Sequence, residues 1–196
     1  MSLDKTSKTN RHLWPCLAVF ILLILLSGCT SQQKSLKKDF PLELISRAKS
    51  DFKSDITDWD IISEKPVEKR INLVIQRAWG VETSVQEYSE LKLTKYLNAR
   101  EFELDPNAPT ELMVYIVKAS EIRKPVRSAK IRMVVKLSNK ESTEPILLGI
   151  VDGIEPRPDL SSGVWMPRSS YFRAAQYAIS KLIHQLDNLH KASPSP

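Results

Sequence analysis

The sequence predicts an α+β domain in which a mainly antiparallel sheet of three to four strands is packed by two helices in a second layer. Three observations predict this class. Residues 112–117 and 146–151 are apolar runs of strand length, and residues 130–137 alternate between apolar and basic residues. Residues 170–189 carry a broad apolar stripe at helical spacing, and residues 82–98 approximate the same spacing. The polar segment SNKEST between the last two strands is typical of a hairpin loop, which favours antiparallel neighbours.

The elements follow one another in an order that supports a single domain. Asp39 is a suitable cap for a first helix, and Pro41 suits the first turn of that helix. The polar stretch that follows this helix contains a possible short strand. The complete predicted order is a helix at 40–52, the possible strand at 59–62, a strand at 71–75, a helix at 82–98, strands at 112–117, 130–137 and 146–151, and a helix at 170–189.

The first 28 residues have the organisation of a cleaved secretory signal. Three basic residues and one acidic residue precede an unbroken apolar run from Leu17 to Leu26. A run of about 7 to 15 apolar residues behind a basic segment is typical of a signal peptide, whereas a membrane-spanning helix needs about 20. Pro15 interrupts any longer apolar stretch. We therefore predict that residues 1–28 are a removable leader.

The end of this leader, Leu26-Ser27-Gly28-Cys29, resembles the lipobox of bacterial lipoproteins. The resemblance implies that the Cys29 thiol receives a diacylglyceryl group, that a peptidase cuts before Cys29, and that the new amine is acylated. Because two or more acyl chains hold a protein stably on a membrane, Cys29 would be a near-permanent anchor. Residue 30 is Thr rather than Asp, which in Gram-negative lipoproteins implies the outer membrane and a periplasm-facing domain.

The leader and the anchor divide the chain into segments. Residues 29–39 would be the lipidated cysteine and a polar tether of about 35 Å when fully extended. Residues 40–189 would form the single domain, and residues 190–196 a disordered tail. Residues 110–188 are also similar to a group of uncharacterised bacterial outer-membrane lipoproteins, on the motifs KPV (124–126), LLGIVDG (147–153) and LD (186–187). That similarity assigns no site.

The composition argues against several classes of partner and cofactor. Removal of the leader leaves a net charge of about +4, too small to indicate nucleic acid binding. No cysteine follows Cys29, which excludes thiolate metal sites from the domain. The two histidines of the mature chain, His184 and His190, both lie on the last predicted helix. We expect no metal, no other cofactor and no nucleic acid partner.

The strand at 130–137 alternates cleanly between apolar and basic residues. Lys130, Arg132 and Lys136 occupy one face of it, which predicts a half-buried strand with a solvated basic face. These three side chains are candidates for contact with an anionic envelope glycan or lipid, such as lipopolysaccharide or peptidoglycan. The alternative is that they only keep the open face of the sheet soluble.

Two further features are candidate sites. Trp165 and Met166 lie in a long proline-containing loop, where an exposed pair would contact a partner protein or a membrane. The alternative is that Trp165 folds back and closes the core. Asp58 and Asp60 flank Trp59 and could act as an acid–base pair, although such loops are usually only solvated.

No recognised catalytic motif occurs in the chain, because HExxH, GxSxG, the P-loop and GxGxxG are all absent. The sequence therefore predicts a non-catalytic binding or assembly factor whose partner is another envelope protein. A binder of anionic glycan or lipid is the second hypothesis, and a hydrolase using Asp58 and Asp60 is the third.

Overall fold

The computed structural model describes residues 39–50, 56–63, 67–122, 128–142, 144–156 and 168–191. The chain divides after Leu42 into two compact units, and all of the sheet belongs to the second unit. The elements in chain order are α2 (Leu42–Lys49), β1 (Thr57–Ile62), β2 (Arg70–Arg77), α3 (Thr83–Asn98), β3 (Glu103–Leu104), β4 (Thr110–Ile122), β5 (Ser128–Asn139), β6 (Pro145–Pro156) and α4 (Arg168–Lys191).

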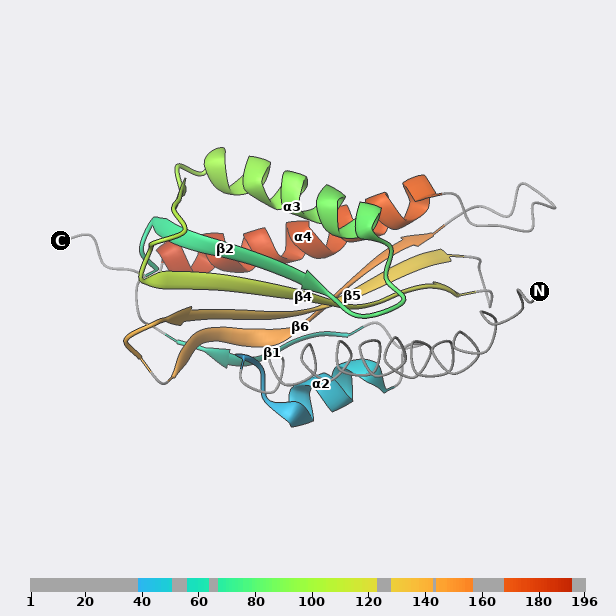
Figure 1. The fold of residues 1–196 in the computed structure, drawn as a ribbon, viewed down its shortest axis with the longest axis horizontal. Helices are drawn as coiled ribbons and strands as arrows, with labels where there is room; N and C mark the ends of the chain where they lie inside the picture. Colours follow the sequence, from blue (N-terminus) through green and yellow to red (C-terminus); the bar gives the residue numbers. More distant parts are fainter. Residues whose placement is uncertain are drawn as a thin grey trace, which may run out of the picture. The chain divides into compact units, whose positions relative to one another are not determined.

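The strands form one mixed sheet of six, in the order β1-β6-β5-β4-β2-β3 (Figure 1). The neighbours from β1 to β4 are antiparallel, whereas β2 is parallel to both β4 and β3. The α+β class predicted from the sequence is correct, but the sheet of three to four mainly antiparallel strands is wrong. The reason is that α3 carries the chain from the end of β2 back to the start of β4, which makes these two strands parallel.

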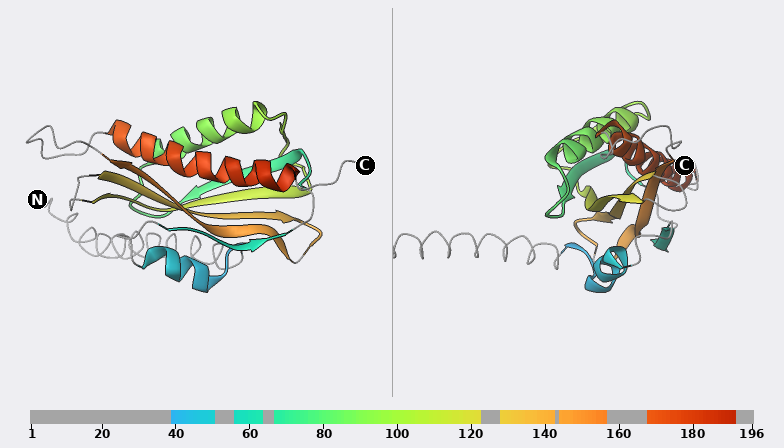
Figure 2. Two further views of the ribbon diagram at one scale, coloured as in Figure 1. Left: turned by 180° about the vertical axis from the view of Figure 1, so that it is seen from behind. Right: turned by 90° about the vertical axis from the view of Figure 1, so that its right-hand side faces the viewer.

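One face of the sheet is covered by α3 and α4, as both views in Figure 2 show. The apolar residues at alternate positions of β4 and β5 point toward these helices and form the main core with the stripe of α4. The contributing side chains are Leu112, Val114, Ile116, Ile131, Met133, Val135, Leu137, Ala174, Ala178, Leu182 and Leu186.

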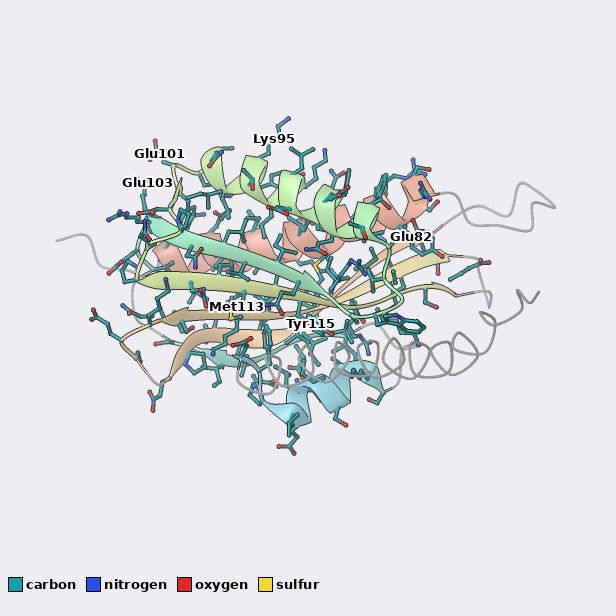
Figure 3. The ribbon with its side chains drawn as sticks, viewed as in Figure 1. Glu82, Lys95, Glu101, Glu103, Met113 and Tyr115 are labelled. Carbon is teal, nitrogen blue, oxygen red and sulfur yellow. The ribbon has the colours of Figure 1, made fainter. Side chains whose placement is uncertain are left out.

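The opposite face of the sheet is also buried, and α2 lies on that side (Figures 1 and 2). Leu44, Ile45 and Ala48 are the buried residues of α2. Met113 and Tyr115 of β4 point away from α3 in Figure 3, and both are buried. Burial raises the pKa of the Tyr115 phenol, because it disfavours the phenolate. The structure therefore has three layers in place of the predicted two, and α2 forms the third.

The predicted strand at 71–75 and the last two predicted helices agree closely with the structure. In contrast, β4 and β6 extend well beyond the predicted strands at 112–117 and 146–151, α2 is shorter than the predicted helix, and β3 was not predicted. α3 and α4 match the helices predicted at 82–98 and 170–189, and α4 continues to Lys191. His190 and Lys191 are thus helical rather than part of a tail. β1 is a full strand that pairs with β6, although only a short possible strand was expected there.

Two ion pairs flank the short strand β3 at the edge of the sheet. Lys69 contacts Glu101 at 2.7 Å, and Arg70 contacts Asp105. The Lys69 ammonium keeps the pKa of Glu101 below its usual value, and the Asn107 amide together with Arg70 does the same for Asp105. Figure 3 shows Glu101 and Glu103 at one end of α3 and Glu82 at the other.

Candidate functional site

A cluster of three charged side chains lies buried between β5, β6 and α2. Arg132 and Asp152 are paired residues in the ladder between β5 and β6. The Arg132 guanidinium donates two hydrogen bonds to the Asp152 carboxylate, each 2.7 Å long. Lys130 contacts the same carboxylate at 2.8 Å. The three side chains are fully buried, with 0% of each exposed. We call Lys130, Arg132 and Asp152 the buried charge cluster.

The buried charge cluster also satisfies the backbone around α2. The Arg132 guanidinium donates to the carbonyl of Ala48, in the last turn of α2, at 3.2 Å. The Asp152 carboxylate accepts a bond from the Ile56 amide, just before β1, at 2.7 Å. Helix-end carbonyls have no partner within the helix, so Arg132 supplies one that α2 needs. The cluster is therefore a structural element that ties α2 and the start of β1 to the central strands.

This arrangement corrects the predicted basic surface. Lys130 and Arg132 are not on a solvated face, and as buried residues they are not available to an anionic glycan or lipid. Alternation along β5 identified the two faces correctly, but it does not reveal that a helix covers the polar one. Lys136 lies further along the strand and is half-buried. The signal that sequence reasoning missed is Asp152, an acidic residue inside an apolar strand, which requires a buried partner.

The acidic pair beside Trp59 is also structural. Arg47 of α2 contacts both oxygens of Asp60, at 2.7 and 2.9 Å, and lies 3.6 Å from Asp58. These exposed contacts connect α2 to β1. This geometry gives both aspartates a structural role in joining α2 to β1.

The turn between β2 and α3 presents a fully exposed tryptophan. Trp79 is 94% exposed, although it is one of the largest apolar side chains. It lies at the second position of a turn that is closed by a bond from the Val81 amide to the Ala78 carbonyl, at 3.2 Å. Gly80 takes the next position with φ of +89°, the left-handed conformation that this kind of turn requires.

Several contacts hold this turn in one shape. Arg77 donates to the Val81 carbonyl at 2.7 Å and to the Thr83 hydroxyl at 2.8 Å. The side chain of Val81 is buried in the main core, and the Ala78 amide bonds to β4 at 2.9 Å. The backbone on both sides of Trp79 is therefore fixed, and the indole is presented on a rigid support.

The charged groups beside the turn are of both signs. Glu82 precedes α3 and forms an exposed ion pair with Arg168, at the start of α4, at 3.1 Å. We call Trp79, Glu82 and Arg168 the Trp79 surface. Sequence reasoning missed it because exposure cannot be read from the residue type. The useful signal was the Trp-Gly pair, which stands between a predicted strand and a predicted helix.

The remaining candidates fall outside the residues that the structure describes. These are Cys29, Trp165 and Met166. Within the described ranges, none of the helices is long and apolar enough to cross a membrane. The same residues contain no group of three His, Cys, Asp or Glu side chains placed to hold a metal ion.

Comparison with known proteins identifies the fold. No protein-family model matches the sequence, and no curated protein matches it. The hypothetical protein CT253 from Chlamydia trachomatis is similar in structure, with a TM-score of 0.50 and 10% identity over 65% of this chain and 100% of that one. At this identity the likeness shows a shared fold and no more.

Two other similar structures are described as bacterial lipoproteins. A putative lipoprotein from Caulobacter crescentus has a TM-score of 0.43 and 16% identity, over 64% of this chain and 93% of that one. A minor lipoprotein from Acinetobacter baumannii has a TM-score of 0.42 and 11% identity, over 61% and 93%. Of these comparisons, the one with CT253 shows the fold of the chain.

Proposed function

We propose that this chain is a lipid-anchored protein of the bacterial outer membrane that faces the periplasm and acts as a non-catalytic binding or assembly factor. Its partner would be another envelope protein, bound through the Trp79 surface. The anchor part of the proposal rests on the lipobox-like residues before Cys29. The binding part rests on one observation, the 94% exposure of Trp79.

An exposed tryptophan on a fixed turn is a favourable anchor for a protein partner. Leaving a large apolar side chain in water forfeits about 1.5 to 3 kcal/mol of burial free energy, which a partner can recover. Tryptophan is among the residues that most often dominate binding energy at interfaces. Because the turn is already rigid, little conformational entropy is lost when the indole is immobilised.

The charged pair that follows the turn favours a protein over an anionic membrane surface. Glu82 would be repelled by acidic lipid head groups, whereas a mixed rim of Glu82 and Arg168 is typical of protein interfaces.

The lipid anchor gives a first prediction. In cells supplied with an alkyne-labelled fatty acid, Cys29→Ser is expected to abolish labelling of the chain, because the hydroxyl does not replace the thiol as the acceptor of diacylglycerol. In-gel fluorescence after click labelling measures the outcome. Cys16→Ser is the matched control and is expected to keep the label. Labelling of the Cys29→Ser chain would contradict the assignment.

The Trp79 surface gives a second prediction. A photo-crosslinking amino acid at position 82 is expected to capture an envelope protein in intact cells, and Trp79→Ala in the same chain is expected to abolish that adduct. The substitution should change the free energy of unfolding by less than about 0.5 kcal/mol, because Trp79 is exposed. Tyr177→Ala, which removes a half-exposed aromatic residue from α4, is the matched control and should keep the adduct. An adduct that survives Trp79→Ala would overturn the proposal.

A further inference from the structure

The strand β2, which leads into the turn that carries Trp79, has an outer edge that faces away from β4. On this edge the Glu103 amide donates to the Lys69 carbonyl at 2.8 Å, and the Asp105 amide donates to the Ile71 carbonyl at 3.0 Å. On the inner side the Ala78 amide donates to β4. Because backbone groups alternate between the two sides of a strand, odd-numbered residues of β2 face outward and even-numbered residues face β4.

The short strand β3 covers only the first part of this edge. It pairs with Arg70 and Ile71 and then ends. In the part of the chain that the structure describes, no other strand pairs with the outer side of β2. Residues 72–77 are all half-buried, so none of them is fully covered. Among the described strands, none therefore pairs with the outward backbone groups of Leu73 and Ile75.

One of these groups is satisfied by a side chain in place of a strand. The Gln86 amide, from α3, donates to the Ile75 carbonyl at 2.9 Å. A side-chain amide has the same donor as a backbone N–H, so Gln86 occupies the position of a missing ladder bond. An extended chain that supplied its own N–H would replace it.

The opposite edge of the sheet is built differently. On β1, Asp58 and Asp60 face Arg47, and the pairing with β6 shifts register between Trp59 and Ile61. Charges and irregular pairing are the usual means by which proteins prevent strands from adding to an edge. The open part of β2, Asn-Leu-Val-Ile-Gln at 72–76, has neither charge nor a register shift.

We propose that the outer edge of β2, from Leu73 to Arg77, accepts an extended segment of the partner protein as an added strand, with Trp79 packing against the end of that segment. The inference rests on the proposed function, since it takes the partner at Trp79 to be a protein. Aligned backbone donors and acceptors recognise an extended polypeptide, and the side chains of Leu73 and Ile75 would contact alternate residues of the added strand.

Hydrogen exchange on the adduct captured through position 82 tests the added strand. In the purified adduct, the amides of Leu73 and Ile75 are expected to exchange at least about tenfold more slowly than in the free protein, because they gain acceptors. The amides of Val74 and Gln76 are bonded to β4 in both states and serve as the internal control, with unchanged rates. Residue-resolved mass spectrometry measures both sets.

A second variant tests the same edge in cells. Leu73→Pro removes an outward N–H and no bond to β4, so it is expected to abolish the adduct while keeping the folded circular dichroism spectrum. If the Leu73→Pro variant fails to fold, the exchange rates of the Leu73 and Ile75 amides in the adduct decide whether a strand is added. A Trp79-dependent adduct without protection of Leu73 and Ile75 overturns the added strand and leaves the proposed function standing. An adduct with lipid, or an adduct that does not depend on Trp79, overturns both the added strand and the proposed function. An adduct with a second copy of this chain overturns the proposal that another envelope protein supplies the strand.

Discussion

Replacing Asp152 by Asn is expected to lower the free energy of unfolding by about 3 to 5 kcal/mol. The change keeps the size of the side chain but removes the negative charge that Lys130 and Arg132 both contact inside the protein. Buried cations that lose their anionic partner carry a large desolvation penalty. Urea unfolding followed by circular dichroism measures the difference.

Two comparisons make this prediction specific to the buried charge cluster. Asp58→Asn, which weakens an exposed contact with Arg47, should change stability by less than about 1 kcal/mol. Replacing all three cluster residues by Met or Leu should recover only part of the loss. The buried charges are then gone, but the Ala48 carbonyl and the Ile56 amide lose their side-chain partners. A loss below about 1 kcal/mol for Asp152→Asn would contradict the structural role of the cluster.

Gly153→Ala is expected to destabilise the domain by about 3 kcal/mol or more. A Cβ at this position of β6 would lie 1.8 Å from the Ala174 carbonyl oxygen and 2.6 Å from the Ala178 nitrogen. Both atoms belong to the backbone of α4, so no rotamer change relieves the overlap and the helix must move away from the sheet. Overpacking of this kind typically costs about 1 to 3 kcal/mol, and more where backbone must shift.

Controls separate this contact from a general effect of losing glycine. Gly80→Ala meets no atom within 4 Å, so its cost should come only from the positive φ, about 1 to 2 kcal/mol. Adding Ala174→Gly to Gly153→Ala should not restore stability, because the obstacle is a main-chain oxygen. Thermal unfolding of the unchanged protein and the three variants gives the comparison. Recovery of stability in the double variant would contradict the close contact between Gly153 and the backbone of α4.

The elements of the core were predictable because each has a local pattern. The apolar stripe of α4 and the alternation of β5 follow directly from helical and strand periods. The order of the strands was not predictable in the same way, since it depends on pairings between distant residues. Ile71–Ile75 was correctly predicted as a strand, but nothing in those residues indicates that it joins β4 in parallel.

The functional residues were predicted less well for a related reason. A strand with Lys130 and Arg132 on one face looks the same whether water or a helix covers that face. Trp79 gave no periodic signal, because its significance comes from an exposure that only the folded turn reveals. Residue type and spacing identify what could form a core, and they say little about which polar face is covered or which apolar residue is left outside.

The position of α2 has a mechanical consequence. The chain enters the sheet-containing unit at α2, and α2 is fastened by Arg47 to the edge strand and by its Ala48 carbonyl to Arg132 on β5. A force applied to the chain before Glu43 therefore loads a strand inside the sheet as well as its edge. Force that reaches β5 acts on a strand held by hydrogen bonds on both sides, to β4 and to β6, whereas the described pairing of β1 is with β6 alone.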